Sequence, residues 1–264
     1  MAAMRYGLIG EKLSHSLSVP IHLAFFREMG LDAAYDLIEI PKTDFARRLP
    51  QVLDTYDGLN VTIPYKRDVM PFLRKMDPLA AEAGAVNTIL CGARAGYNTD
   101  VAGFSDMLQR HGIAVGNQAC YILGTGGASL AVHVALRQLG AASITFVSRH
   151  PTGEQIGYRD LRDRFAGVII NCTPVGMYPH TDGCPLDLET LEHILPRCTG
   201  VADLIYNPPE TNLTRAAADR GIPWCTGLSM LVAQAMEAES IWQGKPIEKQ
   251  LTDQILRELR EKEQ

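Results

Sequence analysis

The sequence contains no apolar run that approaches the roughly 20 residues of a membrane-spanning helix. Its N-terminal residues also lack the apolar segment of a secretory signal peptide. We therefore expect a protein that does not interact with membranes and that is located in the cytoplasm.

An excess of basic residues is also missing. The chain has 25 Lys and Arg residues against 30 Asp and Glu residues, a net charge of −5, and the acidic residues are spread along it. This argues against a nucleic-acid-binding protein, because clustered Lys and Arg residues bind phosphate backbones. An anionic small molecule is not excluded, since a binding site can be locally positive.

The six cysteines form no Cys-x-x-Cys pair, and their spacing matches no zinc-binding pattern. We expect them to be small core residues in a reducing compartment, and we expect no metal site. Internal repeats, low-complexity tracts and long linkers are absent as well.

What the sequence does contain is an alternation of apolar strands and amphipathic helices, which is typical of α/β proteins. Its 264 residues, 46% of them hydrophobic, suffice for two domains. The patterns predict an open α/β domain over residues 1–101 and a second α/β domain over residues 102–226. The helices in residues 227–264 are too few for a domain, so we expect them to pack back on the first domain and complete it.

A group of polar residues stands at the end of a predicted strand in Asn60-Val-Thr-Ile-Pro-Tyr-Lys66. Apolar and polar residues alternate until Pro64, which ends the strand because proline has no backbone donor. Asn60, Thr62 and Lys66 therefore lie where ligands bind in open α/β sheets. A single lysine is more often a solvated surface charge, so a role for Lys66 needs partners elsewhere in the chain.

Asp100 can be such a partner. It precedes a helical pattern that ends at Gly112, and Asn87 lies in a short strand before it. One interpretation is that Asp100 is the N-cap of this helix. The other is that its carboxylate orients Lys66, and one aspartate can do both, with one oxygen for each.

Serines precede the first predicted helix, in Ser14-His-Ser-Leu-Ser18. Ser18 suits the N-cap of that helix. Hydroxyls and first-turn amides at a helix N-terminus can also bind an anion, and Ser16 with Ser18 would suit a carboxylate. The two interpretations are compatible.

A dinucleotide-binding pattern begins near residue 118. A buried-type strand, Gln118–Leu123, leads into Gly124-Thr-Gly-Gly-Ala-Ser129, then a helix over Leu130–Leu139 and a strand over Ser143–Val147. This is the βαβ context that the fingerprint requires, with Ser129 in place of its third glycine, and it predicts that residues 102–226 form a Rossmann-like dinucleotide-binding domain. The glycines permit close approach of a pyrophosphate, and the helix N-terminus supplies donors.

The residues after the second of these strands select the cofactor. A carboxylate there would bind the ribose 2′-hydroxyl of NAD, but the chain reads Val147-Ser-Arg-His150. Arg149 can instead pair with a 2′-phosphate, which favours NADP, unless it is simply a surface arginine.

The rest of the chain continues the α/β pattern. We predict strands over Ile156–Leu161, Val168–Asn171 and Gly200–Tyr206. A long amphipathic helix from Gly227, with Gln234 in its middle, and a final helix with a charged face follow.

Taken together, these motifs resemble those of the shikimate dehydrogenase family, over nearly the whole chain and in the same order. The motifs that match are Ser14-His-Ser-Leu-Ser18, Asn60-Val-Thr-Ile-Pro-Tyr-Lys66, Ala85-Val-Asn-Thr88, Asn98-Thr-Asp100, Gly124-Thr-Gly-Gly-Ala128, Asn171-Cys-Thr-Pro-Val-Gly-Met177, Asp203-Leu-Ile-Tyr206 and Gly227-Leu-Ser-Met-Leu-Val-Ala-Gln234. Each alone could arise by chance, but the series is specific.

The resemblance implies reversible NADPH-dependent reduction of 3-dehydroshikimate to shikimate, in the pathway to aromatic amino acids. It implies that Lys66 and Asp100 are the catalytic pair. The substrate would be bound by Ser16, Ser18, Asn60, Thr62, Asn87, Tyr206 and Gln234. NADP(H) would be bound by Gly124, Gly126, Gly127, Ala128, Ser148, Arg149, Thr173, Gly227 and Met230.

Two features depart from the family pattern. Val19 separates Ser18 from Pro20, where the family usually has proline directly after the second serine. The family usually also has Asn-Arg-Thr where this chain has Ser148-Arg-His150, followed by a helix with a further basic residue. Only about twenty residues separate Arg149 from Val168, so that helix is expected to be lost or reduced.

Two other functions fit part of the pattern. An NAD-dependent quinate/shikimate dehydrogenase would share the fold and catalytic pair, although the missing carboxylate after Val147 argues against it. A non-catalytic nucleotide-binding sensor would share the scaffold, but Lys66 and Asp100 are both present. We expect small-molecule ligands only, and a monomer or homodimer.

Overall fold

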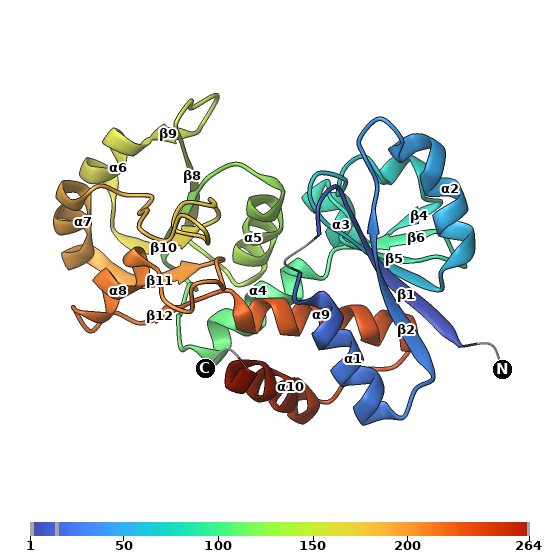
Figure 1. The fold of residues 1–264 in the computed structure, drawn as a ribbon. Helices are drawn as coiled ribbons and strands as arrows, with labels where there is room; N and C mark the ends of the chain where they lie inside the picture. The colour runs from blue at the N-terminus through green and yellow to red at the C-terminus, as the bar shows by residue number, and fades with distance from the viewer. Residues whose placement is uncertain (1–2, 14–15, 263–264) are drawn as a thin grey trace. The chain divides into compact units, whose positions relative to one another are not determined.

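The computed structural model describes residues 3–13 and 16–262, and it divides into two compact units (Figure 1). The first contains the residues up to 100 together with those from 232 onward, and the second contains residues 101–231. The chain leaves the first unit within helix α4 (Asp100–Arg110) and returns to it within helix α9 (Leu228–Gln243).

The first unit is built on a six-stranded sheet with the order β2-β1-β3-β5-β6-β4. β1 is parallel to β2 and β3, whereas β5 is antiparallel to both β3 and β6. The carboxyl ends of β1 and β3 flank the point where the strand order reverses, which is where open α/β sheets bind ligands. The strands are β1 (Met4–Gly10), β2 (Ala33–Glu39), β3 (Gly58–Val61), β4 (Lys75–Met76), β5 (Thr88–Leu90) and β6 (Ala95–Tyr97).

Each face of this sheet has its own apolar layer, because alternate residues of a strand point to opposite faces. On one face, aliphatic side chains such as Ile9 and Leu59 pack with Leu49 of α2 (Phe45–Thr55). On the other face, Tyr6 stacks on Trp242 of α9, and Phe26 of α1 (Ser18–Met29) lies beside it. Helix α10 (Lys249–Lys262) packs on α1. Two short helices connect the strands, the 3₁₀ helix η1 (Met70–Phe72) and α3 (Pro78–Ala83).

The second unit contains a six-stranded parallel sheet with the order β12-β11-β10-β7-β8-β9. This is the doubly wound order of dinucleotide-binding folds, and the order reverses between β7 and β10. The predicted fold class, α/β with a Rossmann-like second unit, is confirmed. The strands are β7 (Ala119–Leu123), β8 (Ser143–Ser148), β9 (Ile156–Gly157), β10 (Gly167–Asn171), β11 (Cys198–Asp203) and β12 (Trp224–Cys225).

Helices cover this sheet and bury a core of aliphatic and aromatic side chains. Leu123, Ile169 and Val201 from the strands pack with Leu161 and Leu213 from the helices. The helices are α5 (Gly127–Gln138), α6 (Tyr158–Arg164), α7 (Leu188–Ile194), the 3₁₀ helix η2 (Leu195–Arg197) and α8 (Asn212–Ala218).

Two predicted strands have different bounds in the structure. The strand predicted over Ile156–Leu161 is wrong beyond Gly157, because α6 begins at Tyr158 and Asp160 Oδ2 accepts a hydrogen bond from Gly157 N at 3.1 Å. Helix α6 has seven residues, so the helix before β10 is reduced but present. β11 ends at Asp203 rather than at Tyr206.

The six cysteines all lie in the described part of the chain, and all are free thiols. In residues 3–13 and 16–262, no group of three or more His, Cys, Asp or Glu side chains could hold a metal ion. Across the same residues, no helix is both long and apolar enough to cross a membrane.

Candidate active site

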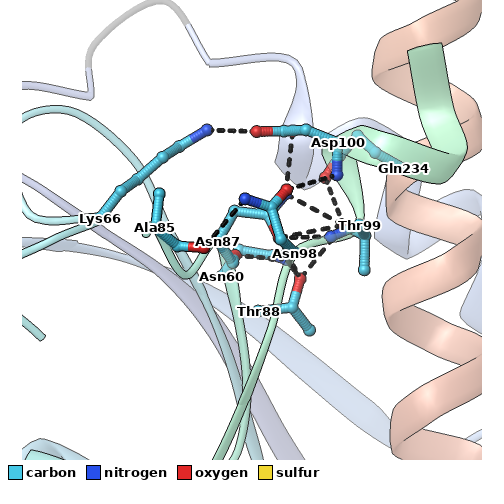
Figure 2. Close-up of polar contacts among 9 residues, drawn as sticks. All are labelled: Asn60, Lys66, Ala85, Asn87, Thr88, Asn98, Thr99, Asp100 and Gln234. Carbon is cyan, nitrogen blue, oxygen red and sulfur yellow. Dashed lines mark hydrogen bonds and ion pairs between the residues drawn. The ribbon is translucent and has the colours of Figure 1, made fainter. Parts of the chain in front are cut away.

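Lys66 and Asp100 form an ion pair in the first unit, with 2.6 Å between Lys66 Nζ and Asp100 Oδ2 (Figure 2). Their side chains are only 16% and 10% exposed. The turn after β3 places the lysine: Tyr65 N donates to Thr62 O at 2.9 Å, and Val86 N donates to Lys66 O at 2.8 Å. Lys66 is therefore held in an ion pair and is not a solvated surface charge.

Both carboxylate oxygens of Asp100, the first residue of α4, accept hydrogen bonds from side chains. Oδ2 accepts from Lys66, and Oδ1 accepts from Asn87 Nδ2 at 2.9 Å. The backbone N–H of Asp100 donates to Asn98 Oδ1 at 3.2 Å, and Asn98 Nδ2 donates to Ala85 O at 2.9 Å. The Asp100 oxygen that was expected to cap the helix accepts from Asn87 instead. The first amide of the helix donates to Asn98.

Asn87 is the centre of a buried polar network behind this pair. Its Oδ1 accepts from Thr99 N at 2.7 Å and from Thr88 Oγ1 at 3.1 Å. Thr88 Oγ1 in turn accepts from Asn60 Nδ2 at 3.1 Å. Because Oδ1 receives these donors, the amide nitrogen of Asn87 must face Asp100, and the network fixes that orientation.

Gln234 and Thr62 lie at the edges of the same region. Thr99 Oγ1 donates to Gln234 Oε1 at 3.3 Å, so this glutamine in the middle of α9 meets the network (Figure 2). Thr62 N donates to Ile9 O at 2.9 Å, which holds Thr62 at the carboxyl ends of β1 and β3. The structure therefore gathers five of the predicted substrate and catalytic residues in hydrogen-bonded contact, with Thr62 beside them; the five are Asn60, Lys66, Asn87, Asp100 and Gln234.

The predicted carboxylate-binding serines stand at the start of α1. Ser16 Oγ donates to Ser18 Oγ at 3.0 Å and accepts from Ser18 N at 3.2 Å. The prediction that Ser18 is the N-cap is wrong, because Ser18 is the first helical residue and Leu17 occupies the cap position. Ser16 instead binds the first helical amide, since a serine side chain easily reaches the backbone two residues on. Ser14 and His15 of the same motif lie outside the described residues.

Three buried residues near these serines were not predicted from the sequence. Tyr35 OH donates to Asn60 Oδ1 at 2.7 Å, and the ring of His22 stacks on Tyr35 with 4.1 Å between centroids. His22 Nδ1 lies 2.6 Å from Glu239 Oε1. From the sequence alone, Tyr35 is an ordinary strand residue, and His22 and Glu239 are ordinary helix residues. Their contacts could not be predicted because they join segments that are far apart in the chain.

The turn after β7 in the second unit is open toward a ligand. Gly124 has a φ of +98°, which favours glycine, and a Cβ there would lie 3.0 Å from Thr173 Cγ2. A Cβ added at Gly126 or Gly127 would have no described atom within 4 Å. Gly126 is the N-cap of α5, and Ala128 lies in its first turn. The missing side chains thus leave the backbone amides accessible.

Ser129 replaces the third glycine of the fingerprint without leaving a polar group unpaired. Its side chain is buried, and its Oγ donates to Gly126 O at 2.6 Å. The hydroxyl is therefore satisfied within the first turn of α5.

Thr173 lies just after β10, on the other side of the strand-order reversal from Gly124. Its N–H and its hydroxyl both donate to Asn171 Oδ1, at 3.0 and 2.7 Å. Asn171 Nδ2 donates to the buried Asp203 Oδ1 at 3.0 Å, and Thr211 Oγ1 donates to Asp203 Oδ2 at 2.8 Å. Burial raises the pKa of Asp203 to about 6, although these donors oppose the shift. Asp203 thus supports the loop that places Thr173.

The end of β8 holds the predicted 2′-phosphate residues. Ser148 Oγ accepts from His150 N at 3.1 Å, and Arg149 is exposed. Burial raises the pKa of Tyr158, the first residue of α6, and the charge of the nearby Arg149 opposes this shift. A guanidinium and a phenol hydroxyl therefore neighbour each other beyond this strand.

Gly227 stands directly before α9 and packs against backbone. A Cβ there would lie 2.1 Å from Leu204 O, and Gly227 N donates to Ile205 O at 2.8 Å. Packing alone therefore requires glycine. Met230 is buried in the first turn of α9, and Tyr206 is half-buried in the loop after β11, also in the second unit.

The residues of the second unit fit a dinucleotide with a 2′-phosphate. The open amides of Gly126 and Gly127 and the N-terminus of the 12-residue helix α5 suit a pyrophosphate. Arg149 suits a phosphate, and residues 148–150 contain no carboxylate that would bind a free ribose 2′-hydroxyl.

Comparisons with known proteins agree with this geometry. A family model described as the shikimate dehydrogenase substrate binding domain matches residues 8–89. The shikimate dehydrogenase (NADP(+)) of Clostridium beijerinckii is 38% identical over 259 residues, which cover 94% of this chain and 94% of that protein.

Two solved structures are similar over nearly the whole chain. The chorismate mutase/shikimate 5-dehydrogenase fusion protein of Clostridium acetobutylicum has a TM-score of 0.93 and 38% identity, with 99% of each chain covered. The shikimate 5-dehydrogenase of Thermus thermophilus, solved with NADP(H) and shikimate, has a TM-score of 0.85 and 29% identity, covering 97% of this chain and 99% of that one. The chain therefore belongs to the shikimate dehydrogenase family.

Proposed function

We propose that this protein is an NADP-dependent shikimate dehydrogenase, which interconverts 3-dehydroshikimate and shikimate in the pathway to aromatic amino acids. The observation that carries the proposal is the largely buried Lys66–Asp100 pair, held by Asn87 at the carboxyl end of β3. Relatives across the whole chain have this activity in their names.

Reduction of a ketone adds a hydride to carbon and a proton to oxygen. NADPH supplies the hydride when it is bound. The Lys66 ammonium donates the proton to the carbonyl oxygen and stabilises the negative charge that develops there. In the reverse direction, neutral Lys66 accepts the proton of the substrate hydroxyl.

Asp100 keeps the ammonium in place. One of the three N–H groups of Lys66 is used in the 2.6 Å contact with Asp100, so the other two can face the substrate. Asn87 holds the second oxygen of Asp100, which stops the carboxylate from turning away. Lys66 and Asp100 therefore act as one unit in this proposal.

The remaining residues of the first unit bind the substrate. Ser16, Ser18 and the first amides of α1 bind its carboxylate, because hydroxyls and free amides at a helix N-terminus favour an anion. Asn60, Thr62, Asn87 and Gln234 contact its ring oxygens, and the family resemblance assigns the same role to Tyr206. The hydrogen bonds among Asn60, Asn87 and Gln234 through Thr88 and Thr99 support a single, rigid arrangement of these groups.

The second unit binds NADP(H). The turn of Gly124, Gly126, Gly127 and Ala128 binds the pyrophosphate, and Ser148 with Arg149 binds the 2′-phosphate. Thr173, Gly227 and Met230 lie near the nicotinamide. The open space at Gly126 and Gly127 supports the first assignment, and the exposed guanidinium supports the second.

We place the protein in the cytoplasm, as a monomer or homodimer with small-molecule ligands only. Six free thiols support a reducing compartment. Light scattering on a size-exclusion column distinguishes a monomer of 29.0 kDa from its dimer.

Steady-state kinetics with shikimate and quinate, each with NADP⁺ and NAD⁺, test the function. We expect the highest kcat/KM for shikimate with NADP⁺. A higher value for quinate with NAD⁺ would replace this proposal with an NAD-dependent quinate/shikimate dehydrogenase. Binding of NADPH without turnover of either substrate would indicate a nucleotide-binding sensor.

A further inference from the structure

Tyr35 of β2 is a buried residue that contacts a predicted substrate group. Its hydroxyl donates to Asn60 Oδ1 at 2.7 Å. Burial raises the pKa of Tyr35, and the nearby side chain of Ser18 opposes this shift. One buried hydroxyl therefore contacts a group predicted for the ring and lies near a group predicted for the carboxylate.

The strand register explains how Tyr35 reaches Asn60. Tyr35 is aligned with Tyr6 of β1, and Asn60 of β3 is aligned with Leu8 of β1. Residues 6 and 8 point to the same face, so Tyr35 and Asn60 do too. Their strands lie on either side of β1, roughly 10 Å apart, a gap that a tyrosine can cross over the face of the sheet but a serine or threonine cannot.

The position of the Tyr35 ring is fixed from its other side. His22 stacks on the ring with 4.1 Å between centroids and 9° between planes. His22 Nδ1 lies 2.6 Å from Glu239 Oε1, and Gln243 Nε2 donates to Glu239 Oε2 at 3.1 Å. Tyr35, His22 and Glu239 are all buried, so none can move without disturbing the packed face of the sheet.

We propose that Tyr35 is a positioning residue for substrate recognition, which fixes Asn60 in the orientation that binds shikimate. This rests on the proposed function. The Tyr35 hydroxyl donates to the amide oxygen of Asn60, so the amide nitrogen faces Thr88 Oγ1 and Asn87 O, at 3.1 and 3.4 Å.

This orientation predicts what Asn60 offers to the substrate. Both hydrogens of its amide nitrogen are engaged, while its oxygen keeps one of two lone pairs. Asn60 would thus accept a hydrogen bond from a substrate hydroxyl. Loss of the Tyr35 hydroxyl would let the amide rotate and offer a donor instead.

The test is Tyr35→Phe, which keeps the ring on His22 and removes only the hydroxyl. We expect the KM for shikimate to rise about tenfold, because a buried acceptor loses its partner, while the KM for NADP⁺ changes less than about twofold. The matched control is Tyr65→Phe. Tyr65 is also buried in the first unit, but its hydroxyl donates to a backbone carbonyl, that of Ile40. This control should lower the melting temperature without a selective change in KM.

Two further variants separate positioning from general stability. Replacing Tyr35 with p-aminophenylalanine restores a donor toward Asn60, and the KM for shikimate should fall between those of wild type and Tyr35→Phe. In an Asn60→Ala background, Tyr35→Phe should have a smaller effect than in wild type, since the two residues act together. If Tyr35→Phe does not fold, Tyr35 is replaced with p-fluorophenylalanine, which fills the place of the hydroxyl but cannot donate, and a KM for shikimate equal to that of wild type then overturns the proposal.

The outcomes distinguish this proposal from the function on which it rests. A wild-type protein that does not oxidise shikimate with NADP⁺ overturns both. An active wild type with a Tyr35→Phe variant that resembles wild type or Tyr65→Phe overturns the positioning role alone. A selective rise in the KM for shikimate that p-aminophenylalanine partly reverses supports it.

Discussion

Asp203 should make the second unit less stable as the pH rises from 4 to 7. Its carboxylate is buried at the end of β11, and burial raises its pKa from 3.8 to about 6. Hydrogen bonds from Ile205 N, Asn171 Nδ2 and Thr211 Oγ1 favour the ionised form and reduce the shift, but they do not reverse it. Asp203 is therefore a buried acid that ionises more easily in the unfolded chain.

The sign and size of the effect follow from the two pKa values. Between pH 3.8 and about 6, the folded chain keeps the proton on Asp203 while the unfolded chain has released it. The unfolded state then binds fewer protons, so the free energy of unfolding falls as the pH rises. At about 1.36 kcal/mol per pKa unit, the loss is ~3 kcal/mol. It is absent below the lower pKa and complete above the higher one.

Urea unfolding of wild type and Asp203→Asn measures this pH-dependent loss in the free energy of unfolding. Asparagine keeps an oxygen for two of the donors, and Thr211 can turn its hydroxyl to accept from the new amide. In a Trp242→Phe background, Trp224 of β12 is the only tryptophan, so its fluorescence follows the second unit. The free energy of unfolding of wild type minus that of Asp203→Asn should fall by about 2.5 kcal/mol between pH 4 and pH 7, because a small part of the loss has already occurred at pH 4. A constant or rising difference would refute the reasoning.

Three other predictions concern the proposed chemistry. Lys66→Met should lower kcat by about 10²- to 10⁴-fold with a small change in KM, since a proton donor is lost, and near wild-type turnover would remove Lys66 from the mechanism. Arg149→Gln should raise the KM for NADP⁺ about tenfold and leave that for NAD⁺ unchanged, and an equal effect on both would contradict a 2′-phosphate contact. Gly126→Ala should keep the melting temperature but weaken NADPH binding in a fluorescence titration. Gly227→Ala should lower the melting temperature by several degrees, because its Cβ would lie 2.1 Å from Leu204 O. A reversed pattern would contradict both assignments.

Features that depend on local chemistry could be predicted from the sequence. The turn at Gly124 follows a buried strand and precedes a helix, so the βαβ unit follows from residues that are neighbours in the chain. The Lys66–Asp100 pair was a weaker inference, because each residue also has an ordinary explanation. Their contact depends on β3, β5 and β6 lying side by side, which the alternating patterns allow but do not specify.

Features that depend on strand register or on long-range packing could not be predicted. Residues 156–161 begin and end with apolar side chains that suit a strand or one turn of helix equally, and Asp160 decides for the helix by binding Gly157 N. Tyr35 is an ordinary strand residue in the sequence, since its contact with Asn60 needs the register of three strands. The contact between His22 and Glu239 joins residues 217 positions apart.

The predicted ligand-binding residues of the two units present different chemical groups at equivalent places. Both place their predicted residues where the strand order reverses. The second unit presents backbone amides there, which need glycines and little else. The first presents side chains, whose orientations must be set by other side chains because amides and hydroxyls rotate.

The hydrogen bonds of the first unit form a chain in which each residue donates to the next, and this chain sets the orientations of the side chains. Tyr35 donates to Asn60, Asn60 to Thr88, Thr88 to Asn87, and Asn87 to Asp100. Each member uses its acceptor on the donor before it, so each has a single orientation, and the series ends on a carboxylate that only accepts. The direction depends on both ends: the Tyr35 hydroxyl starts it, and the charge of Asp100 terminates it beside Lys66. A buried residue on the far side of β1 thereby helps to set the geometry of the proposed catalytic pair.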